Sequence, residues 1–478
     1  MDRESAESLH RGKGQGWLTL LTVAVNGLII VLDMSIVNLS FPGLTRIFHT
    51  EPSVVMWITV VYSLMTVGLI PILGRIADMY GRKKIFVLGY ILFTLGLFMC
   101  SLSRSILQLI MSRMVQGVGA AMNMALGFAL VTDAFPARER GKALGITQSV
   151  FAVGPVVGIT LGGFLLDALG WRAVFYTRVP ICVIGILMAW KFLRETEPLN
   201  TGRKIDIVGT ATLFGSLSSL LLFLNLGARA GFSSPLILVL GNVSWVFFAV
   251  FILQEKRTGQ PVIDLRLFRN RLFTGGMITG ALFFLAQSAQ LFLFPYYLIE
   301  GVHLSASEAG SLFAVYFLLL FSVAPLSGWL SDKFGSRPLC TVGMGLMCLG
   351  LFLLSRLDAD AGRGDIISSL VVLGIGGGLF VSPNTSVIMG AVSRGSLGTA
   401  GALIATIRQI GISSGISIAG VIFTIRMAYH TIRLSSSTPD PTILNQLSVI
   451  GGYRDTLLMV AGMCFIGIFS VIFVLKGN

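Results

Sequence analysis

The stretch GRIADMYGRKK, residues 74–84, decides how the rest of the chain is interpreted. It concentrates charge and glycine between two apolar runs, residues 53–73 and 85–103, neither of which contains a charged side chain. Glycine reaches the positive φ angles that a tight reversal of the chain needs. The stretch therefore predicts a short basic turn on the aqueous side of a membrane.

The composition indicates a membrane protein. Of the 478 residues, 54% are hydrophobic and only 12% are charged, whereas soluble domains carry about 25% charged residues. The apolar residues occur in continuous runs of about 20 residues, the length that crosses a bilayer as a helix. Hydrocarbon forces every backbone polar group to pair internally, so these runs predict an all-α integral membrane protein. Fourteen spans are expected, near residues 17–40, 53–73, 85–103, 106–131, 142–166, 172–190, 207–226, 235–254, 272–299, 307–330, 338–355, 366–390, 398–424 and 455–475.

The positive charges are distributed unequally between the two sides of these spans. Of the 35 Lys and Arg residues, 23 fall on the side of the N-terminal tail and of residues 74–84, nine on the other side and three within spans. Because basic loops stay in the cytoplasm, both termini are expected to be cytoplasmic, in a multi-pass protein of the cell (inner or plasma) membrane. This distribution also accounts for the net charge of +13 without a nucleic-acid partner.

An internal repeat divides the chain. Residues 328–337, GWLSDKFGSR, follow residues 74–84 by 254 positions and keep both glycines, the aspartate and a final basic residue, with Trp329 and Ser336 in place of Arg75 and Arg82. Duplicated bundles are the architecture of many secondary transporters. We therefore expect a cytoplasmic tail (1–16), a six-helix bundle (17–190), a linker with an inserted helix pair (191–271) and a second six-helix bundle (272–478).

Six motifs occur in the same order as in a known family. Residues 74–84 resemble the signature between spans 2 and 3 of the major facilitator superfamily. The segments LDMSIVN (32–38), RMVQGVG (113–119), GPVVG (154–158), PVIDL (261–265) and RQIG (408–411) resemble its fourteen-span drug:proton antiporter branch. The resemblance implies a major facilitator fold, with two six-helix bundles plus two extra transmembrane helices. It implies proton-coupled export of amphipathic drug-like compounds by alternating access, by a monomer that is not an enzyme and uses no cofactor other than the proton.

The resemblance also assigns roles to two groups of residues. A cytoplasmic latch that stabilises the outward-open state would comprise Gly74, Arg75, Asp78, Gly81 and Arg82. An antiporter motif, kinked by its proline and packed through its small residues, would comprise Gly154, Pro155, Gly158 and Gly162. Asp78 is placed to pair with Arg75 or Arg82, or to cap a helix end. The alternatives are a basic loop that only sets orientation and ordinary packing of small residues between helices.

Asp33 is an acidic residue inside a predicted span. Burying a charge in a membrane is costly, so such a residue indicates a functional site. Asp33 and Arg113 each lie seven residues from the outer end of their spans, which places both at a depth of roughly 10 Å. We therefore expect Asp33 to bind the coupling proton and Arg113 to act with it. The alternative is a permanent structural ion pair between the two.

Several polar residues within spans are candidates for a substrate cavity: Asn38, Gln116, Arg178, Gln287, Gln290, Tyr297, Asn384 and Arg408. Gln287 and Gln290 are three residues apart and share a face of their helix. Hydrogen bonds between helices are the alternative role for these polar side chains. Arg178 stands where the resembled branch usually has asparagine, which adds a positive charge near the site.

Other residue patterns exclude several functions. The five cysteines lie in or beside apolar runs without paired spacing, so neither disulfides nor a metal site is expected. The glycines of residues 374–378 lie in an apolar span without a following lysine, which excludes a phosphate-binding loop. Two alternatives to drug export stay open. One is proton-coupled export of a lipid or anionic metabolite, favoured by the three intramembrane arginines, and the other is a receptor or regulator that retains the fold without transport.

Overall fold

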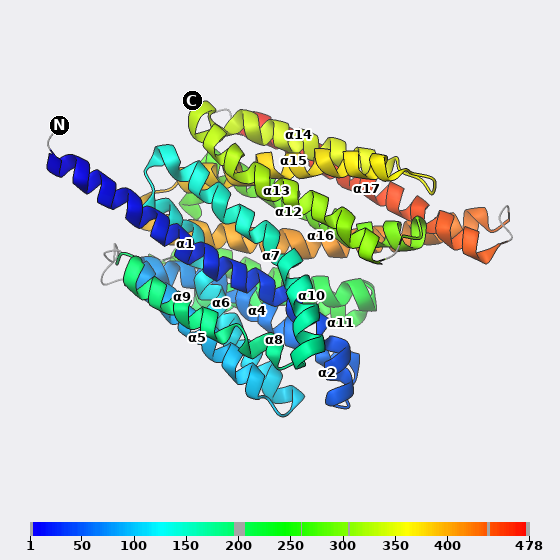
Figure 1. Ribbon diagram of the computed structural model, residues 1–478, viewed down its shortest axis with the longest axis horizontal. Helices are drawn as coiled ribbons and strands as arrows, with labels where there is room; N and C mark the ends of the chain where they lie inside the picture. The colour runs from blue at the N-terminus through cyan, green and yellow to red at the C-terminus, as the bar shows by residue number, and fades with distance from the viewer. Residues whose placement is uncertain (1–2, 196–205, 260, 305, 437–439, 475–478) are drawn as a thin grey trace. The chain divides into compact units, whose positions relative to one another are not determined.

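The computed structural model describes residues 3–474, apart from 196–205, 260, 305 and 437–439. The described residues form helices and no β-strand (Figure 1), which confirms the expected all-α fold. Thirteen helical segments are long and apolar enough to cross a membrane, and α7 (Arg140–Leu169) is a further helix of 30 residues. The expectation of fourteen spans is consistent with these helices.

The helices follow the order that the repeat predicts. The first six spans correspond to α1 (Arg3–Leu39), α4 (Trp57–Tyr80), α5 (Arg82–Leu102), α6 (Ile106–Ala134), α7 and the pair α8 (Ala173–Tyr176) and α9 (Val179–Phe192). Short helices α2 (Phe41–Ile47) and α3 (Pro52–Val55) connect α1 to α4, and α10 (Ile207–Ala230) and α11 (Pro235–Arg257) form the inserted pair. The last six spans are α12 (Arg271–Tyr296), α13 (Ala306–Phe334), α14 (Ser336–Ser355), α15 (Arg363–Gly390), α16 (Leu397–Leu434) and α17 (Pro441–Val474).

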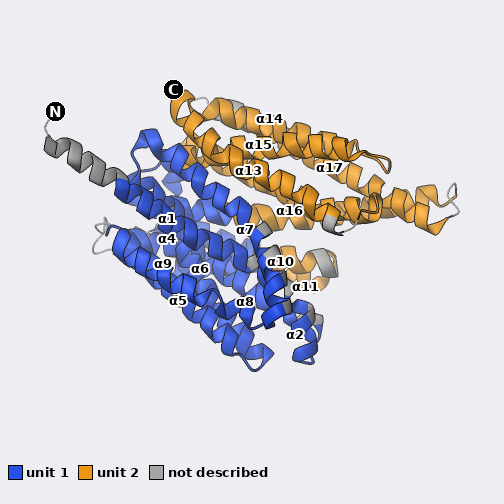
Figure 2. Ribbon diagram, viewed as in Figure 1, with its two compact units in different colours: residues 1–219, 243–267, 389–406 blue, residues 220–242, 268–388, 407–478 orange. Residues whose placement is uncertain are grey.

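The chain forms two compact units (Figure 2). Unit 1 comprises residues 1–219, 243–267 and 389–406, and unit 2 comprises residues 220–242, 268–388 and 407–478. The first turns of α16 therefore belong to unit 1 and the rest of that helix to unit 2. The four sequence ranges expected as domains stay a prediction.

Close packing of α5 on α6 recurs in α14 on α15. A Cβ added to Gly96 would lie 2.5 Å from Cβ of Gln116, and one added to Gly350 would lie 2.8 Å from Cβ of Leu373. Gly96 and Gly350 are 254 residues apart, the same offset as the two copies of the basic motif. Glycine at both positions lets the helix backbones approach each other. The duplication inferred from sequence is thus repeated in the packing of each unit.

The expected loop at residues 74–84 is helical, contrary to the prediction. α4 continues to Tyr80 and α5 begins at Arg82, so Gly81, with φ of 106°, is the whole connection. Gly335 makes the same one-residue turn between α13 and α14 with φ of 82°. A glycine with positive φ reverses the chain at a single residue, which lets both helices extend further than composition suggests.

Two other segments are also more helical than expected. α1 begins at Arg3, so residues 3–16, expected to form a polar tail, continue the helix. The long connection expected at residues 426–454 is divided between α16, which ends at Leu434, and α17, which begins at Pro441. For residues 426–454 the sequence left a short helix or a hairpin open, and the structure extends the two flanking helices instead, because a helix that is already nucleated by a span extends at little cost.

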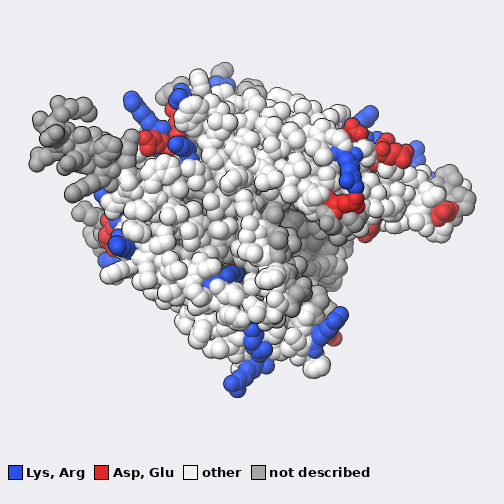
Figure 3. Space-filling model, viewed as in Figure 1, with Lys and Arg blue, Asp and Glu red and all other residues white. Residues whose placement is uncertain are grey.

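Many large apolar side chains are exposed, as expected for helices that contact lipid. Trp245 on α11 is 74% exposed, and Trp190 on α9 and Phe164 on α7 are each 69% exposed. On the face shown in Figure 3, wide areas carry no charged side chain. Exposed apolar surface of this extent is unusual in soluble monomers and marks a surface that is covered in the native setting.

Candidate functional site

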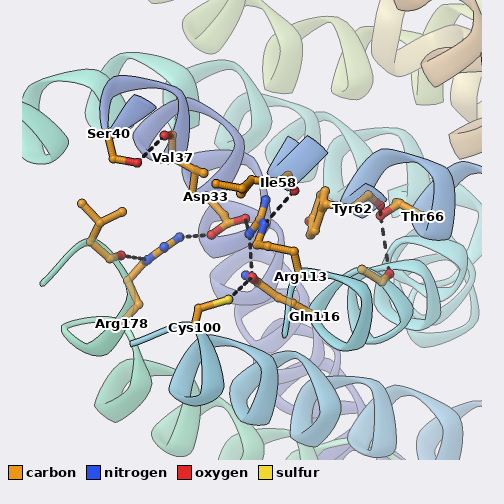
Figure 4. A network of polar contacts seen from close by, with 12 residues as sticks. Asp33, Val37, Ser40, Ile58, Tyr62, Thr66, Cys100, Arg113, Gln116 and Arg178 are labelled. Carbon is orange, nitrogen blue, oxygen red and sulfur yellow. Dashed lines mark hydrogen bonds and ion pairs between the residues drawn. The ribbon is translucent and has the colours of Figure 1, made fainter. Parts of the chain in front are cut away.

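Asp33 on α1 is completely buried and is held by two arginines (Figure 4). Arg113 Nη1 of α6 donates to Oδ2 at 2.7 Å, and Arg178 Nη1 donates to Oδ1 at 2.5 Å. Each carboxylate oxygen thus accepts one charge-assisted hydrogen bond, the strong kind. The proximity of Asp33 and Arg113 expected from their equal depth is present, and Arg178 joins them.

Further contacts of Arg113 fix its position on α6. Its Nη1 also donates to Oε1 of Gln116 at 2.5 Å, and its Nε donates to the carbonyl of Ile58 at 3.3 Å. The guanidinium lies 4.2 Å from the centroid of the Tyr62 ring, within the range of a cation–π interaction. Contacts with α4 and α6 therefore fix the orientation of the Arg113 guanidinium that bonds to Asp33.

Arg178 is positioned by the break between α8 and α9. It is the residue that precedes α9, and Pro180 occupies the first turn of that helix, where a missing N–H is tolerated. Arg178 Nε donates to the carbonyl of Val174 at 2.8 Å. The side chain is thereby directed from α9 toward α1 in the same unit.

The cluster of Asp33, Arg113, Gln116 and Arg178, called here the Asp33 network, carries one more positive than negative charge. Burial of such charges is costly unless each is paired and hydrogen-bonded. Two donors in the network, Nη2 of Arg178 and Nε2 of Gln116, are buried without a hydrogen-bond partner among the described residues. The network therefore contains two buried donors that are not used within it.

A second cluster lies at the opposite end of α4, around Asp78. Arg82 donates to Asp78 Oδ1 through Nε at 3.0 Å and through Nη2 at 2.8 Å. The backbone N–H groups of Gly398 and Thr399 donate to the two carboxylate oxygens at 3.0 and 2.9 Å, and the Thr399 hydroxyl adds a bond of 3.1 Å. Arg82, one of the two arginines that the sequence offered, pairs with Asp78.

Asp78 thus caps the N-terminus of α16. The first N–H groups of a helix lack partners within it, and the helix dipole favours a negative charge there. Gly74 allows the close approach, because a Cβ added to it would lie 2.4 Å from Cβ of Ala402. Arg82 extends the cluster through a 2.5 Å bond from Nη2 to the carbonyl of Arg394.

Sequence reasoning missed several partners of this cluster. Gly398 and Thr399 act through backbone N–H groups, which leave no pattern in the sequence. Arg75 interacts electrostatically with Glu255 of α11, a buried carboxylate whose Oε1 accepts the N–H of Val262 at 3.0 Å. The C-terminal end of α11 therefore lies at the same end of unit 1 as residues 74–84.

The glycines of residues 154–162 pack within unit 1. A Cβ added to Gly154 would lie 2.8 Å from Cγ1 of Val31, so this glycine lets α7 approach α1 two residues before Asp33. Gly158 and Gly162 are also buried in α7, whereas the side chain of Pro155 lies outside the described residues. The small residues serve helix packing here, and their role in export stays a prediction.

The predicted glutamine pair of α12 has two different environments in unit 2. Gln287 Nε2 donates to the hydroxyl of Tyr316 at 2.5 Å. Gln290 is completely buried, and neither of its amide atoms has a hydrogen-bond partner among the described residues. Tyr297 donates to the carbonyl of Asp358 at 3.0 Å and stacks on Tyr453 with centroids 4.7 Å apart.

The remaining predicted cavity residues are also accounted for. Asn384 of α15 donates to the carbonyl of Gly276 at 3.1 Å and accepts the Thr279 hydroxyl at 3.2 Å, which joins α15 to α12. Arg408 lies 5.3 Å from the centroid of the Phe284 ring. The side chain of Asn38 is outside the described residues.

The candidate residues thus form several groups rather than one. The proton-coupling and cavity candidates of the first half, apart from Asn38, meet in the Asp33 network of unit 1, whereas the latch residues lie around Asp78. Those of the second half lie in unit 2 with separate neighbours. Among the described residues, no three His, Cys, Asp or Glu side chains are grouped so that they could hold a metal ion, and the five cysteines are free.

Residues 23–416 match the sequence profile described as Major Facilitator Superfamily. The chain belongs to the major facilitator superfamily. This confirms the family that the six motifs indicated, and the matched region contains both the Asp33 network and the Asp78 cluster. The chain is therefore a member of a family of membrane transporters.

Individual major facilitator proteins resemble the chain along most of its length. It is 33% identical over 462 residues to "Riboflavin transporter RibZ" of Clostridioides difficile, covering 97% of this chain and 98% of that protein. It is 28% identical over 414 residues to "Multidrug transporter protein MdtP" of Bacillus subtilis, covering 85% and 76% of the two chains. Multidrug-transporter relatives are consistent with the drug-antiporter branch.

A solved major facilitator structure shares the fold. The human organic anion transporter MFSD10 (TETRAN) superposes with a TM-score of 0.66, covering 95% of this chain and 99% of that one at 16% identity. At this identity the likeness shows the fold alone.

Proposed function

We propose that this protein is a secondary active exporter that moves amphipathic drug-like compounds out of the cell in exchange for protons, by alternating access. The observation that carries the proposal is the buried carboxylate of Asp33, bonded to Arg113 and Arg178. An ionisable residue in a membrane span is costly and marks a coupling or substrate route. The membership in a transporter family and the multidrug-transporter relatives support the same reading.

The geometry suggests how Asp33 would couple a proton to a change of conformation. Both oxygens accept bonds from guanidinium groups, an arrangement that suits the ionised carboxylate. A proton on either oxygen would face an arginine donor, and two donors cannot bond to each other. Proton binding and the release of an arginine are therefore linked. Because the three residues belong to α1, α6 and the start of α9, the release changes how these helices hold one another.

The Asp78 cluster supplies the matching element at the other end of α4. We expect it to act as the latch, because it holds the first turn of α16 through one carboxylate. α16 continues from unit 1 into unit 2, so the hold acts on a helix shared by both units. Breaking the latch would then favour the alternative conformation.

The relatives suggest which compounds to test first. One similar protein is named a riboflavin transporter. Riboflavin, an amphipathic and fluorescent compound, is therefore one specific candidate, to be tested after the multidrug dyes. Multidrug dyes are the first candidates, by the relatives named for multidrug transport. A lipid or anionic metabolite would be consistent with the surplus of arginines in the Asp33 network, and a non-transporting receptor would bind such compounds without flux.

The test is transport by the purified chain in proteoliposomes with an imposed pH gradient. The proposal expects riboflavin or rhodamine 123 to move against its concentration gradient only while the pH gradient lasts. Asp33→Asn should remove this flux, and Asp360→Asn, which removes the charge of an exposed aspartate in the connection before α15, should retain it. Binding without flux would point to the receptor, and flux that ignores the pH gradient would reject proton coupling.

We further propose that the protein lies in the cell membrane as a monomer with both termini in the cytoplasm. The excess of Lys and Arg on one side of the spans supports this orientation. Cysteine-accessibility labelling of the two termini in intact cells tests it, and labelling of either terminus by an impermeant reagent would contradict it.

A further inference from the structure

The Asp33 network contains two buried hydrogen-bond donors that are not bonded to an acceptor among the described residues. Nη2 of Arg178 and Nε2 of Gln116 have no hydrogen-bond partner among the described residues, although Nη1 of the same arginine and Oε1 of the same glutamine are engaged. Arg178 is only 4% exposed and Gln116 is completely buried. A buried polar atom without a partner is uncommon and calls for an occupant that is absent from the protein itself.

The charge of the network specifies what kind of occupant fits. Asp33 balances only one of the two guanidinium groups, so one positive charge is left over in a buried position. Arg178 also lies directly before α9, whose first-turn N–H groups add positive potential. An electron-rich oxygen at Arg178 would satisfy both its free donor and the excess positive charge. An ammonium or other organic cation would satisfy neither.

We propose that Arg178 is a specificity-determining residue that docks an electron-rich oxygen of the transported molecule through Nη2, and that it selects against organic cations. The inference rests on the proposed function, because it names the substrate class at the same site. Oxygen-rich neutral or acidic compounds are then preferred over the cationic dyes that a lone intramembrane aspartate would attract. Gln116, which accepts from the same Nη1 of Arg113 that bonds to Asp33, has a second free donor in the network.

The competing occupant is a buried water molecule. Water can satisfy isolated buried donors and needs two to four polar partners to do so. A structural water would keep the substrate out of contact with Arg178, so Arg178→Lys, which retains the charge, would then retain the whole preference for fluorescein. This difference separates a structural water from a substrate contact.

The experiment compares two dyes of similar shape and opposite charge. Fluorescein and rhodamine 123 share a three-ring core, but the first is an anion and the second a cation at pH 7.5. Binding of each is measured by fluorescence anisotropy with the full chain in detergent. The variants are Arg178→Gln, Arg178→Lys and Arg172→Gln. Arg172 is the matched control, because it lies six residues earlier, is exposed, and donates instead to the carbonyl of Ser103 at 3.1 Å.

The wild-type chain should bind fluorescein more tightly than rhodamine 123. Arg178→Gln should weaken fluorescein binding by about ten- to a hundredfold, the usual value of a hydrogen bond to a charged group. Its binding of rhodamine 123 should persist or strengthen, which also shows that the variant is folded. Arg178→Lys should retain part of the preference, and Arg172→Gln all of it.

Equal loss of both dyes in Arg178→Gln, or an unchanged preference, would overturn the inference. The proposed function is tested separately, by flux of the same dyes in proteoliposomes. If the charge-selective effect on binding appears while flux ignores the pH gradient, proton exchange is rejected and the role of Arg178 stands. If flux depends on the pH gradient but the dye preference is the same with and without Arg178, proton exchange is supported and the role of Arg178 is rejected.

Discussion

Replacing Asp78 by asparagine should release the start of α16 from α4. The substitution keeps the size of the side chain, removes its charge and turns one acceptor oxygen into an NH2 donor. Asp78 now accepts from Arg82, from two backbone N–H groups and from the Thr399 hydroxyl. At least one of these donors would face the new NH2 group, and the buried guanidinium of Arg82 would lose its counter-charge.

The size of the effect follows from the burial of this pair. Both side chains are almost completely buried, at 1% exposure for Arg82 and 0% for Asp78. Removing one partner of a buried ion pair costs about 3–5 kcal/mol. Since about 1.4 kcal/mol corresponds to a factor of ten in an equilibrium constant, the closed form of the cluster should be disfavoured by roughly a hundredfold or more.

Hydrogen–deuterium exchange in lipid nanodiscs measures this opening directly. The amides of Gly398 and Thr399 lie in the first turn of α16, where no carbonyl of the same helix can accept them. Their protection therefore depends on Asp78, and exchange should accelerate by about a hundredfold or more in Asp78→Asn.

Asp133→Asn is the control for this prediction. Asp133 lies 3.6 Å from the same arginine but is 27% exposed, so its loss should change exchange by less than about fivefold. Unchanged exchange at Gly398 and Thr399 in Asp78→Asn would refute the proposed latch. An equal effect of both substitutions would show that only the charge of Arg82 matters.

Two further predictions concern helix packing and are measured by thermal unfolding in detergent. Gly350→Val should lower the melting temperature strongly, because its Cβ would lie 2.8 Å from Cβ of Leu373, whereas Gly345→Val on the same helix meets no atom within 4 Å and should be nearly neutral. Equal changes in melting temperature in the two variants would show that the change in helix propensity, and not the steric contact, causes the effect. Asn384→Leu should destabilise by about 1–3 kcal/mol, because it leaves the Thr279 hydroxyl and the Gly276 carbonyl without their partner. No change in the melting temperature would assign Asn384 a role outside packing.

Much of the fold was predictable, because its determinants are local. Continuous apolar runs and their length give the spans, and the offset of 254 residues between the two basic motifs recurs in the turns at Gly81 and Gly335. The helix ends were not predictable from composition. Residues 74–80 are charged and glycine-containing yet helical, because Asp78 and Arg82 bury their charges against the end of α16.

The candidate site was predictable where depth in the membrane constrains it. Asp33 and Arg113 lie at equal depth in neighbouring spans, and an acid and a base at one depth can pair. Spacing along a helix was less informative for Gln287 and Gln290. They share a face of α12, yet one bonds to Tyr316 and the other is buried without a partner. The neighbour that each side chain contacts depends on how the helices pack, and the periodicity of the sequence does not predict this packing.

The most direct test of the account is to count the protons that leave the protein when substrate binds. Purified protein in weakly buffered detergent is titrated with riboflavin while the external pH is recorded, at an acidic pH at which part of the protein carries a proton on Asp33. If Asp33 exchanges this proton for substrate, wild-type protein should release up to about one proton per bound riboflavin, and Asp33→Asn should release none while still binding riboflavin. Equal proton release by the Asp33→Asn variant, or proton uptake by the wild-type protein, would contradict the exchange that the account places at Asp33.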